Sequence, residues 1–417
     1  PEASHAVPLH PETLAISAGY DPASASGAAK PPAYLTSTFV YPSAAAAKAL
    51  HAAFFDGVEN GATGHIYGRL GHPGLDIVEA RLAALDGAAD AAIFASGMAA
   101  VSAVMLANLS PGDAVLHGQP VYGGTDMLLH TELSRFGIRP VGFTDGCDPA
   151  VMRRAAETAL DGGRIGLIWA ETPANPTAAL VDLSAVADLA GMIADRQGSR
   201  PLIVADNTFL GPFQQSPLAH GADLCLTSLT KYAGGHSDLL AGGVSGAAPL
   251  IARLKAFRTL AGSTLDAFSC WLLARSFETM ALRGGRAAAN AAAVAQMLAA
   301  HPRVRAVTWL GFSPEASPAG RVAARQCRGS GSTFAFRLAG DEAAAFRLLD
   351  ALRVIKVAVS LGGTETLICH PASTTHYAVP EARRTAQGID AGTLRLSVGI
   401  EHPDDLIADL ARALEAV

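Results

Sequence analysis

The sequence predicts an α/β protein whose mostly parallel sheet is flanked by helices and followed by a smaller C-terminal α+β domain. Between about positions 90 and 245, short apolar runs rich in β-forming residues alternate with longer helical patterns, as in βαβ units. These runs are continuously apolar, which is typical of strands that helices cover on both faces. The chain of 417 residues is long enough for two or three domains of roughly 150 residues.

The composition excludes several classes of protein. Half of the residues are hydrophobic and 16% are charged, so the chain can bury a large core and is not disordered as a whole. Lys and Arg number 31 against 37 Asp and Glu, without long runs of either, which argues against nucleic acid as a partner. The first residues lack the apolar run of a signal peptide, and no stretch reaches about 18 apolar residues, so we expect no membrane segment.

The cysteines favour a cytoplasmic protein without a metal site. They are five in number, widely scattered, and never spaced as Cys-x-x-Cys. This pattern indicates neither a disulfide framework nor a zinc site. We therefore expect a reducing compartment and chemistry on a small molecule.

Polar residues follow four of the five strands of the predicted sheet. The strand candidates are residues 91–95, 114–117, 165–170, 202–205 and 224–227. Polar groups follow four of them directly, at residues 96–98, 171–173, 206–208 and 228–231. Because the carboxyl ends of parallel strands meet at one edge of a sheet, we expect the functional residues to converge there.

We expect the chain to be divided into three parts. Residues 1–62 form an arm, residues 63–280 the α/β domain, and residues 281–417 the C-terminal domain. The arm is rich in Pro, Gly, Ser and Ala and poorly periodic, so it should be irregular and wrap another surface. An Ala-rich stretch over about 265–300 predicts a long helix broken at Gly284 and Gly285. The C-terminal domain is expected to contain a Pro/Gly/Arg-rich loop at 311–330, strands at 332–338 and 393–398, and a final helix at 404–414.

One lysine follows the last strand of the α/β region, in the segment LTSLTKYAGGHSD at residues 226–238. A buried ammonium is costly unless it is paired or made neutral, and a Schiff base with an aldehyde cofactor is such a conversion. Ser228 and Thr230 could hold a phosphate beside Lys231. Taken alone, Lys231 could equally be a surface loop lysine.

Asp206 ends the preceding strand, in the segment VADNTF. A pyridinium nitrogen needs a carboxylate partner to stay protonated, and pyridoxal phosphate enzymes supply this partner together with a lysine. The alternative for an isolated aspartate in this position is a helix cap. The pair of Lys231 and Asp206 is more specific than either residue alone.

Two further segments are compatible with such a cofactor. ASGMAA leads from a strand into a helix, so the amides of Gly97 and Met98 could bind a phosphate at the positive helix end. Tyr122, in PVYGGT, is an aromatic residue suited to stacking on a flat ring. A tight turn without a ligand and a core tyrosine are the alternative interpretations.

Eight motifs in order resemble the Cys/Met-metabolism, or trans-sulfuration, family of pyridoxal-phosphate-dependent enzymes. Along the chain they are ASGMAA, YGGT, ETPANP, ADNT, SxTKYxxGHSD, SLGGxETL, HPASTTH and RLSVGIE, and the resemblance runs from about residue 30 to the C-terminus. It implies the fold type I architecture. In character the chain is closest to methionine γ-lyase and cystathionine γ-synthase-like members.

The resemblance also implies roles for individual residues. Lys231, Tyr122 and Asp206 would be catalytic: the lysine forms the internal aldimine and shuttles protons, the tyrosine stacks and acts at the leaving group, and the aspartate pairs with the pyridine nitrogen. Arg395 would clamp the substrate carboxylate with help from Ser360. The residues expected to bind the cofactor are Gly97, Met98, Tyr122, Asn175, Asp206, Thr208, Ser228, Thr230 and Lys231, with Tyr67 and Arg69 contributed by a neighbouring subunit.

Tyr67 and Arg69 lie in GHIYGRLGHPG, which is similar to a family segment that completes the neighbour's phosphate site. The resemblance therefore implies a homo-oligomer, at least a dimer and by family habit a tetramer, to which the arm contributes. Around these residues the segment departs from the family pattern at Gly68, His72 and Gly74. His72 is either a harmless capping change or a substrate-specific group.

Four positions bear on the reaction. Val359 stands where cystathionine γ-lyases and γ-synthases carry Glu and methionine γ-lyases carry Val, although it could simply be a core residue. Gly124 replaces the methionine γ-lyase cysteine and enlarges the space near the leaving group, and Arg258-Thr259 replaces a Lys-Asp pair.

The leading hypothesis is γ-elimination or γ-replacement on a methionine- or homoserine-type L-amino acid through a vinylglycine-quinonoid intermediate. One alternative is a specialised γ-replacement with S-adenosylmethionine or an unusual nucleophile. The others are β-elimination of the cystathionine β-lyase type, transaminase-like chemistry, and a regulatory protein that keeps the cofactor without turnover.

Overall fold

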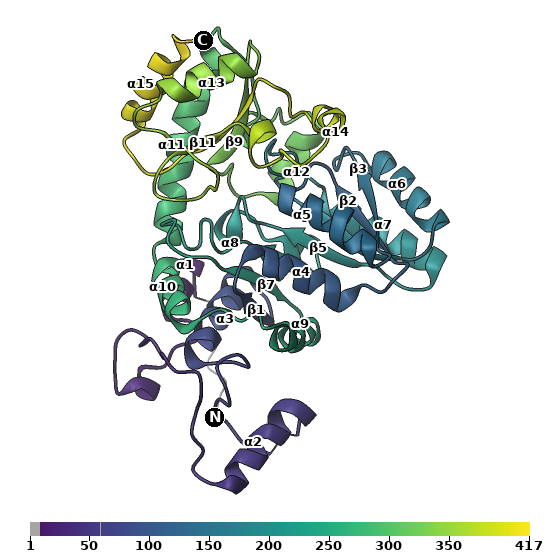
Figure 1. Cartoon of the computed structure of the whole chain (residues 1–417), viewed down its shortest axis with the longest axis vertical. Helices are drawn as coiled ribbons and strands as arrows, with labels where there is room; N and C mark the ends of the chain where they lie inside the picture. Colours follow the sequence, from purple (N-terminus) through teal and green to yellow (C-terminus); the bar gives the residue numbers. More distant parts are fainter. Residues whose placement is uncertain (1–8, 59) are drawn as a thin grey trace.

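The computed structural model describes residues 9–58 and 60–417 and is built around two sheets (Figure 1). In this part of the chain, the larger sheet has seven strands in the order β1-β7-β6-β5-β4-β2-β3. Its strands are β1 (Asp90–Phe94), β2 (Ala114–Gly118), β3 (Arg139–Phe143), β4 (Ile165–Glu171), β5 (Leu202–Asp206), β6 (Leu224–Thr227) and β7 (Gly242–Gly246). The α/β class that the apolar runs predict is confirmed.

Most neighbouring strands of the larger sheet are parallel, from β3 through β2, β4 and β5 to β6. β7 is the exception, because it pairs antiparallel with both β1 and β6. The five predicted strands correspond to β1, β2, β4, β5 and β6, whereas β3 and β7 were not predicted. β7 has the sequence GGVSG, and glycine is depleted in strands, so its composition gives little signal.

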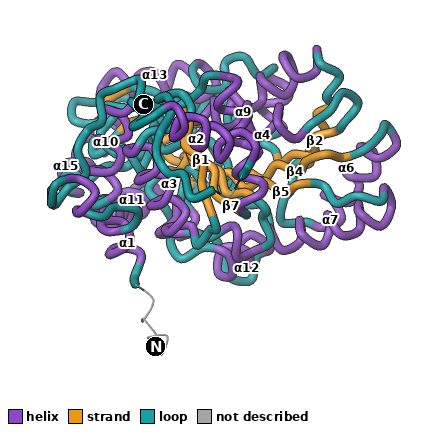
Figure 2. The backbone as a smooth tube through the Cα atoms, turned by 90° about the horizontal axis from the view of Figure 1, so that it is seen from below, coloured by secondary structure: helices purple, strands orange, loops and turns teal. Residues whose placement is uncertain are grey.

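Helices cover both faces of the larger sheet (Figure 2). On one face, α4 (Gly97–Asn108) and α9 (Ala248–Ala261) share a buried core with alternate residues of the strands. On the other face lie α3 (Pro73–Asp86), α6 (Pro149–Asp161), α7 (Leu183–Gln197) and α10 (Ala267–Phe277). Burial on both faces explains why the strands read as continuous apolar runs.

The five-stranded sheet lies in the C-terminal part of the described chain, in the order β10-β11-β12-β9-β8. Helices α11 (Met280–Ala300), α13 (Glu342–Ala351) and α15 (Pro403–Leu414) pack on it around a separate core. Its strands are β8 (Val304–Val307), β9 (Thr333–Leu338), β10 (Lys356–Val357), β11 (Leu367–Cys369) and β12 (Thr393–Ser397). We propose that the chain has two domains, residues 63–280 around the larger sheet and residues 281–417 around the smaller one.

Short elements connect the longer ones. They are α5 (Gly123–Met127), η2 (Leu128–Leu133), α8 (Gly211–Gln214), η3 (Pro217–His220), η4 (Leu310–Phe312), α12 (Pro318–Gln326), η5 (Pro371–Ser373) and α14 (Glu381–Ala386). None of the helices in the described residues is both long and apolar enough to cross a membrane.

Two expectations about helices were wrong. The break in the Ala-rich stretch falls between α10 and α11, near Thr279, and α11 runs through Gly284 and Gly285. Each glycine costs a helix only about 1 kcal/mol relative to alanine, which the buried face of α11 outweighs. The expected loop at 311–330 contains α12, where Ser317 caps the Gly320 N–H and proline occupies the first helical position.

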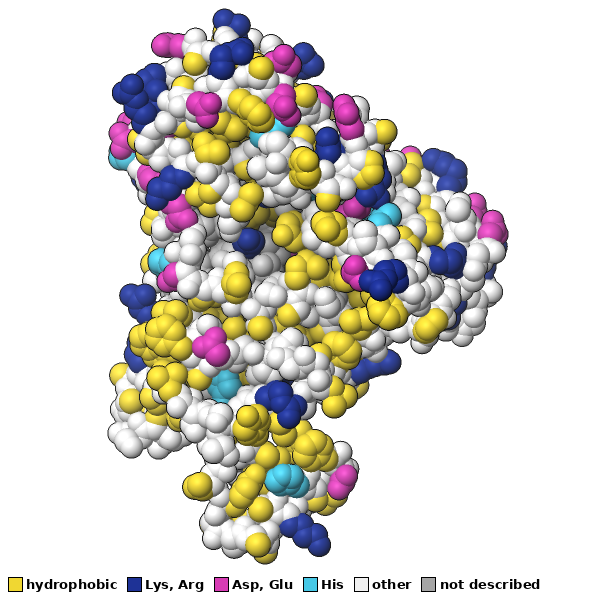
Figure 3. Space-filling model, in the orientation of Figure 1, with side chains coloured by type: hydrophobic (Ala, Val, Ile, Leu, Met, Phe, Trp, Pro, Cys, Tyr) yellow, Lys and Arg dark blue, Asp and Glu magenta, His cyan; other side chains and the backbone are white. Residues whose placement is uncertain are grey.

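The arm is less irregular than its composition indicates. It contains α1 (Pro11–Ser17), η1 (Pro22–Ala25) and α2 (Ala44–Asp56), while residues 1–8 lie outside the described part of the chain. Helix α1 is held by Arg81, which donates a 2.8 Å hydrogen bond to the carbonyl of Ile16. Helix α2 projects from the body, and hydrophobic side chains such as Phe54 and Phe55 are exposed on it (Figures 1 and 3).

Candidate active site

The polar residues that end the strands line one cavity of about 410 Å³. The larger sheet supplies most of its wall, from the ends of β4, β5 and β6 and the start of α4, and the C-terminal domain supplies the segment after β10 together with β12. The predicted site residues in the lining are Gly97, Met98, Tyr122, Asn175, Asp206, Thr208, Ser228, Thr230, Lys231, Val359, Ser360 and Arg395. The expected convergence at one edge of the sheet is therefore observed.

Lys231 projects its amine toward the C-terminal domain. Its Nζ donates a 2.9 Å hydrogen bond to Ser360 Oγ. Burial, together with the charge of Arg395, lowers the pKa of Lys231 to about 8. A larger fraction of this amine is neutral near physiological pH than for an exposed lysine, as attack on an aldehyde requires.

Asp206 is the last residue of β5 and is buried. Its Oδ1 accepts hydrogen bonds from the backbone N–H of Thr208 at 3.0 Å and from the Thr208 hydroxyl at 2.6 Å. Burial raises the pKa of Asp206 to about 6. None of the ion pairs found in the described residues includes this carboxyl group. A cationic ring nitrogen bound in the cavity would supply the missing partner.

The start of α4 lies against the strand-end loop that carries Ser228. A Cβ on Gly97 would be 2.7 Å from Ser228 Oγ, so only glycine permits this close approach. The Ser228 N–H in turn donates a 2.8 Å hydrogen bond to Thr208 Oγ1. Backbone amides at a helix N-terminus beside hydroxyls form a set of donors suited to a phosphate.

Thr230 is tied to its own loop. Its hydroxyl donates to the Ala241 carbonyl at 3.1 Å and accepts from the Ala241 N–H at 2.9 Å. The hydroxyl proton is thus already used, so the side chain fixes the loop between β6 and β7. A second hydrogen bond to a phosphate would require this arrangement to change.

Tyr122 lies at the other side of the cavity with its side chain 41% exposed. A Cβ on Gly124 would be 2.7 Å from Tyr122 Cε1 and 3.1 Å from Met98 Sδ. The tyrosine ring therefore rests against the backbone of Gly124. The space that the missing side chain creates is partly filled by the ring itself.

Arg395, on β12, is 2% exposed and joins the two domains. Its Nη1 donates to Asn175 Oδ1 at 3.1 Å, and its Nη2 donates to the Ser360 carbonyl at 2.6 Å. Ser360 has φ of +84°, which is costly for a residue with a side chain and is characteristic of functional sites. Val359, 54% exposed, lies next to it on the cavity wall.

Glu171 is a lining residue that the sequence reasoning did not assign to the site. It is the last residue of β4 and is 4% exposed. Burial, and then the charge of Asp206, raise the pKa of Glu171 to about 8. A carboxylate at the end of a continuously apolar strand, in the same pattern as Asp206, was the available signal.

Tyr67 and Arg69 do not line this cavity. Arg69 Nη1 donates a 2.6 Å hydrogen bond to the Thr259 carbonyl, and its guanidinium carbon lies 5.9 Å from the centroid of the Tyr67 ring. Tyr67 is 44% exposed and forms a bridge with Thr38 of the arm. Both residues are thus placed on a surface outside the chain's own site.

His72 and Arg258 have structural contacts. His72 caps α3, because its Nδ1 accepts from the Leu75 N–H at 3.1 Å while Nε2 donates to the Leu265 carbonyl at 3.1 Å. Burial lowers the pKa of His72, which favours this neutral form. Arg258 pairs with Glu79 at 2.5 Å in the core of the larger domain. The capping interpretation of His72 agrees with this geometry.

The cavity residues fit pyridoxal phosphate. A buried carboxyl group without a cation, an amine with a lowered pKa, and a glycine-permitted approach between a helix start and a serine line one cavity. These groups match the ring nitrogen, the aldehyde and the phosphate of that molecule.

Comparison with known proteins leads to the same group. The family described as Cys/Met metabolism PLP-dependent enzyme matches residues 12–415. L-methionine gamma-lyase of Pseudomonas putida is 38% identical over 406 residues, which is 97% of each chain. Cystathionine gamma-synthase of Mycobacterium bovis is 38% identical over 407 residues, 97% of this chain and 96% of the relative.

A solved structure extends the agreement to the fold. Cystathionine gamma synthase from Xanthomonas oryzae pv. oryzae, in complex with cystathionine, superimposes with a TM-score of 0.86 at 36% identity, covering 98% of this chain and 99% of that one. The chain belongs to the Cys/Met metabolism family of pyridoxal-phosphate-dependent enzymes and has the fold type I architecture.

Proposed function

We propose that this enzyme catalyses γ-elimination or γ-replacement on a methionine- or homoserine-type L-amino acid. The observation that carries the proposal is the single cavity that places the amine of Lys231 and the guanidinium of Arg395 on the same serine, Ser360. A basic amine beside a carboxylate-binding group is the arrangement needed to bind an amino acid and move its α-proton. Pyridoxal phosphate, when bound, supplies the electron sink for the resulting carbanion.

Each residue around the cavity has a proposed part in holding the cofactor. Lys231 would hold the aldehyde, and Asp206 would keep the ring nitrogen protonated, which the burial of this carboxyl group supports. Tyr122 would hold the heterocycle by stacking, and Thr208 and Asn175 would lie near the ring face and its 3′-oxygen. The groups proposed for the phosphate are the amides of Gly97 and Met98 with Ser228, joined by the partner subunit's copies of the Tyr67–Arg69 segment. Thr230 would join them once its hydroxyl turned away from the Ala241 carbonyl.

The proton transfers fall to two side chains. Lys231, with a pKa of about 8, is suited to take a proton from Cα and then to act at Cβ. Tyr122, exposed to the cavity, is placed to donate a proton to the departing γ-substituent. Arg395 binds the α-carboxylate, and its hydrogen bonds to Asn175 and Ser360 hold its plane in position.

Chemistry at the γ-carbon is favoured over β-elimination by the peripheral residues. Val359 presents an apolar surface where a glutamate would attract the distal amino group of cystathionine. Gly124 leaves room for Tyr122 to lie back against the backbone. The relatives named above are a methionine gamma-lyase and a cystathionine gamma-synthase, and both names denote reactions at the γ-carbon.

A substrate panel tests the proposal. The purified enzyme, loaded with pyridoxal phosphate, is incubated with L-methionine, O-acyl-homoserines, cystathionine and S-adenosylmethionine, with and without a thiol nucleophile. Without the thiol we expect 2-oxobutanoate and ammonia, and with the thiol we expect a new amino acid. In heavy water these products should carry deuterium at Cβ. Pyruvate from cystathionine, with no 2-oxobutanoate from any substrate, would establish β-elimination instead.

We also propose a homo-oligomer with at least two subunits, and a tetramer as the complete form. Two observations support it: Tyr67 and Arg69 lie outside the chain's own cavity, and helix α2 projects with exposed Phe54 and Phe55. Cross-linking and size determination in solution test the oligomeric state.

A cytoplasmic location is supported by the cysteines, which are all free thiols in the structure.

A further inference from the structure

Glu171 bridges two loops that carry proposed site residues. Its Oε2 accepts a 2.7 Å hydrogen bond from the N–H of Tyr122, and its Oε1 accepts a 2.7 Å hydrogen bond from the N–H of Asn175. Tyr122 follows β2 and Asn175 follows β4, so one carboxylate joins the ends of two adjacent strands. We propose that Glu171 is a positioning residue that sets the Tyr122 ring and the Asn175 amide relative to the cofactor and substrate.

The two hydrogen bonds that residue 171 accepts explain why it is a glutamate. Both contacts are backbone N–H donors, so the bridging group needs two acceptor oxygens a fixed distance apart. A glutamine has one acceptor and would turn its NH₂ toward the other donor. An aspartate is one methylene shorter and cannot reach both. Glutamate is therefore the side chain that matches both length and acceptor count.

The bridge continues through the rest of the site. Asn175, held by Glu171, accepts from Arg395 through Oδ1. Arg395 donates to the Ser360 carbonyl, and the Ser360 hydroxyl accepts from Lys231. The chain of contacts thus runs from the proposed stacking residue to the proposed carboxylate clamp and the lysine. A displacement at Glu171 reaches both the cofactor side and the substrate side.

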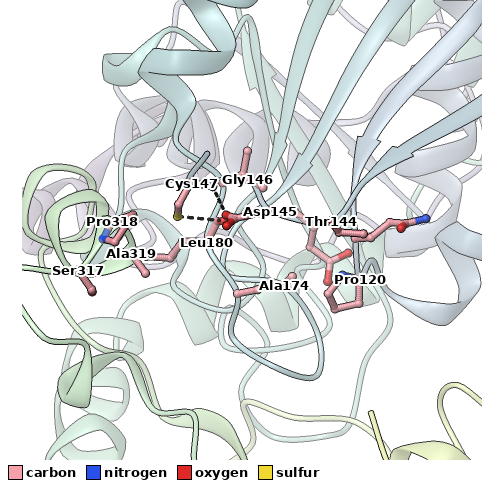
Figure 4. Close-up of a pocket in the computed structure, with 14 residues that line it drawn as sticks. Pro120, Thr144, Asp145, Gly146, Cys147, Ala174, Leu180, Ser317, Pro318 and Ala319 are labelled. Atoms are coloured by element: carbon pink, nitrogen blue, oxygen red, sulfur yellow. Dashed lines mark hydrogen bonds between the residues drawn. The ribbon is translucent and has the colours of Figure 1, made fainter. Parts of the chain in front are cut away.

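Glu171 lines two cavities. One is the main cavity, and the other, of about 260 Å³, is also lined by Ala174 and Pro120 (Figure 4). The two hydrogen bonds that Glu171 accepts, from the N–H groups of Tyr122 and Asn175, connect the backbone of both loops beside the main cavity.

Glu171 also acts electrostatically on Asp206. The two residues are register partners on the parallel strands β4 and β5, and both are buried. A cation at the ring nitrogen position would favour ionisation of both carboxyl groups, so the pair in turn favours a protonated ring there. The positioning of Tyr122 and Asn175 and this electrostatic effect act in the same direction, because both strengthen binding of the protonated ring.

The test compares Glu171→Gln and Glu171→Asp with the wild-type enzyme. Three quantities are measured: the Kd of pyridoxal phosphate for the apoenzyme, kcat and KM for the substrate that the panel identifies, and the preference for that substrate over its carboxamide. For both variants we expect Kd to rise about tenfold and kcat/KM to fall about 100-fold, with kcat and KM both affected. The carboxylate preference should fall about tenfold, because Arg395 loses its fixed partner.

Asp113→Asn is the matched control. Asp113 is also buried and accepts a 2.8 Å hydrogen bond from a backbone N–H, that of Ser110, but it precedes β2 at the opposite edge of the sheet. This variant should lower the melting temperature while leaving Kd and the carboxylate preference within about twofold of wild type. Glu171 variants that behave like it, losing only stability, would overturn the proposal.

The inference rests on the proposed function, and the measurements separate the two. If the wild-type enzyme binds pyridoxal phosphate but yields no γ-product, the proposed function fails while the Kd values still decide on Glu171. Wild-type Kd and kcat/KM in Glu171→Asp would also overturn the proposal, because reach to both N–H groups is what it requires.

Discussion

Glu171 and Asp206 are in-register neighbours at the carboxyl ends of β4 and β5, 4% and 7% exposed respectively. Burial, and for Glu171 also the charge of Asp206, raise their pKa values to about 8 and about 6. Two acids that resist ionisation at the bottom of one cavity leave the apoenzyme poised to accept a cation. The first prediction follows from the sign of these shifts.

Glu171 and Asp206 should contribute stability to the cofactor-free enzyme that is lost as the pH rises from about 4 to about 8. A carboxyl group whose folded-state pKa exceeds its unfolded value of about 4 retains a proton in the folded state that the unfolded chain releases, so stability present at low pH is lost through this window. Thermal unfolding of the apoenzyme at several pH values measures this. Asp206→Asn should reduce the loss by a few degrees in Tm, and an unchanged pH profile would contradict the assignment.

The rate at which the apoenzyme captures pyridoxal phosphate should rise with pH and level off above about pH 8. The neutral amine of Lys231 is the reactive form, and burial followed by the Arg395 charge lowers its pKa to about 8. Arg395→Gln removes a positive charge, so the profile should move to higher pH. Stopped-flow absorbance gives the rates. Lys231→Ala should show no Schiff base at any pH, whereas the exposed Lys356→Ala should match wild type.

Two inactive variants should restore activity when their subunits mix. In Arg69→Ala the neighbour's site is damaged, and in Lys231→Ala the chain's own site is damaged, so a mixed dimer contains one intact site. Random reassociation of equal amounts should recover about a quarter of the wild-type activity, since half of the dimers are mixed. Activity after mixing and refolding is the measurement. No recovery, with mixed dimers demonstrated by a tag, would place Arg69 outside the neighbour's site.

Adding a side chain at Gly124 should displace the Tyr122 ring. A Cβ there would be 2.7 Å from Tyr122 Cε1, closer than nonbonded carbons approach, so Gly124→Ala forces the ring to move. We expect kcat/KM to fall about tenfold or more because catalytic groups tolerate little misplacement. Gly191→Ala is the control, since nothing lies within 4 Å of its added Cβ, and it should leave kcat/KM unchanged. Equal kinetics in the two variants would mean that the ring position at Gly124 does not matter.

Local sequence patterns predicted the strands that are apolar on both faces and failed where composition was neutral. The strand Leu224–Thr227 was predicted to the residue, whereas the glycine strand Gly242–Gly246 gave no signal. Its glycines are explained only by the assembled sheet, where a Cβ on Gly242 would be 2.2 Å from the Ser96 carbonyl oxygen. Helix α12 was missed because its serine–proline start was interpreted as a loop signal.

The sequence by itself determined the α/β class, the edge of the sheet that holds the chemistry, and the types of residue gathered there, because periodicity and strand-end polarity are local properties. Only the tertiary structure decided how these residues are held. Glu171 became part of the site through hydrogen bonds to residues that follow two different strands, and Arg395 reached Asn175 from 220 positions away in the chain. Such contacts arise from the packing of two domains against each other, and no local pattern encodes which buried donor will face which acceptor.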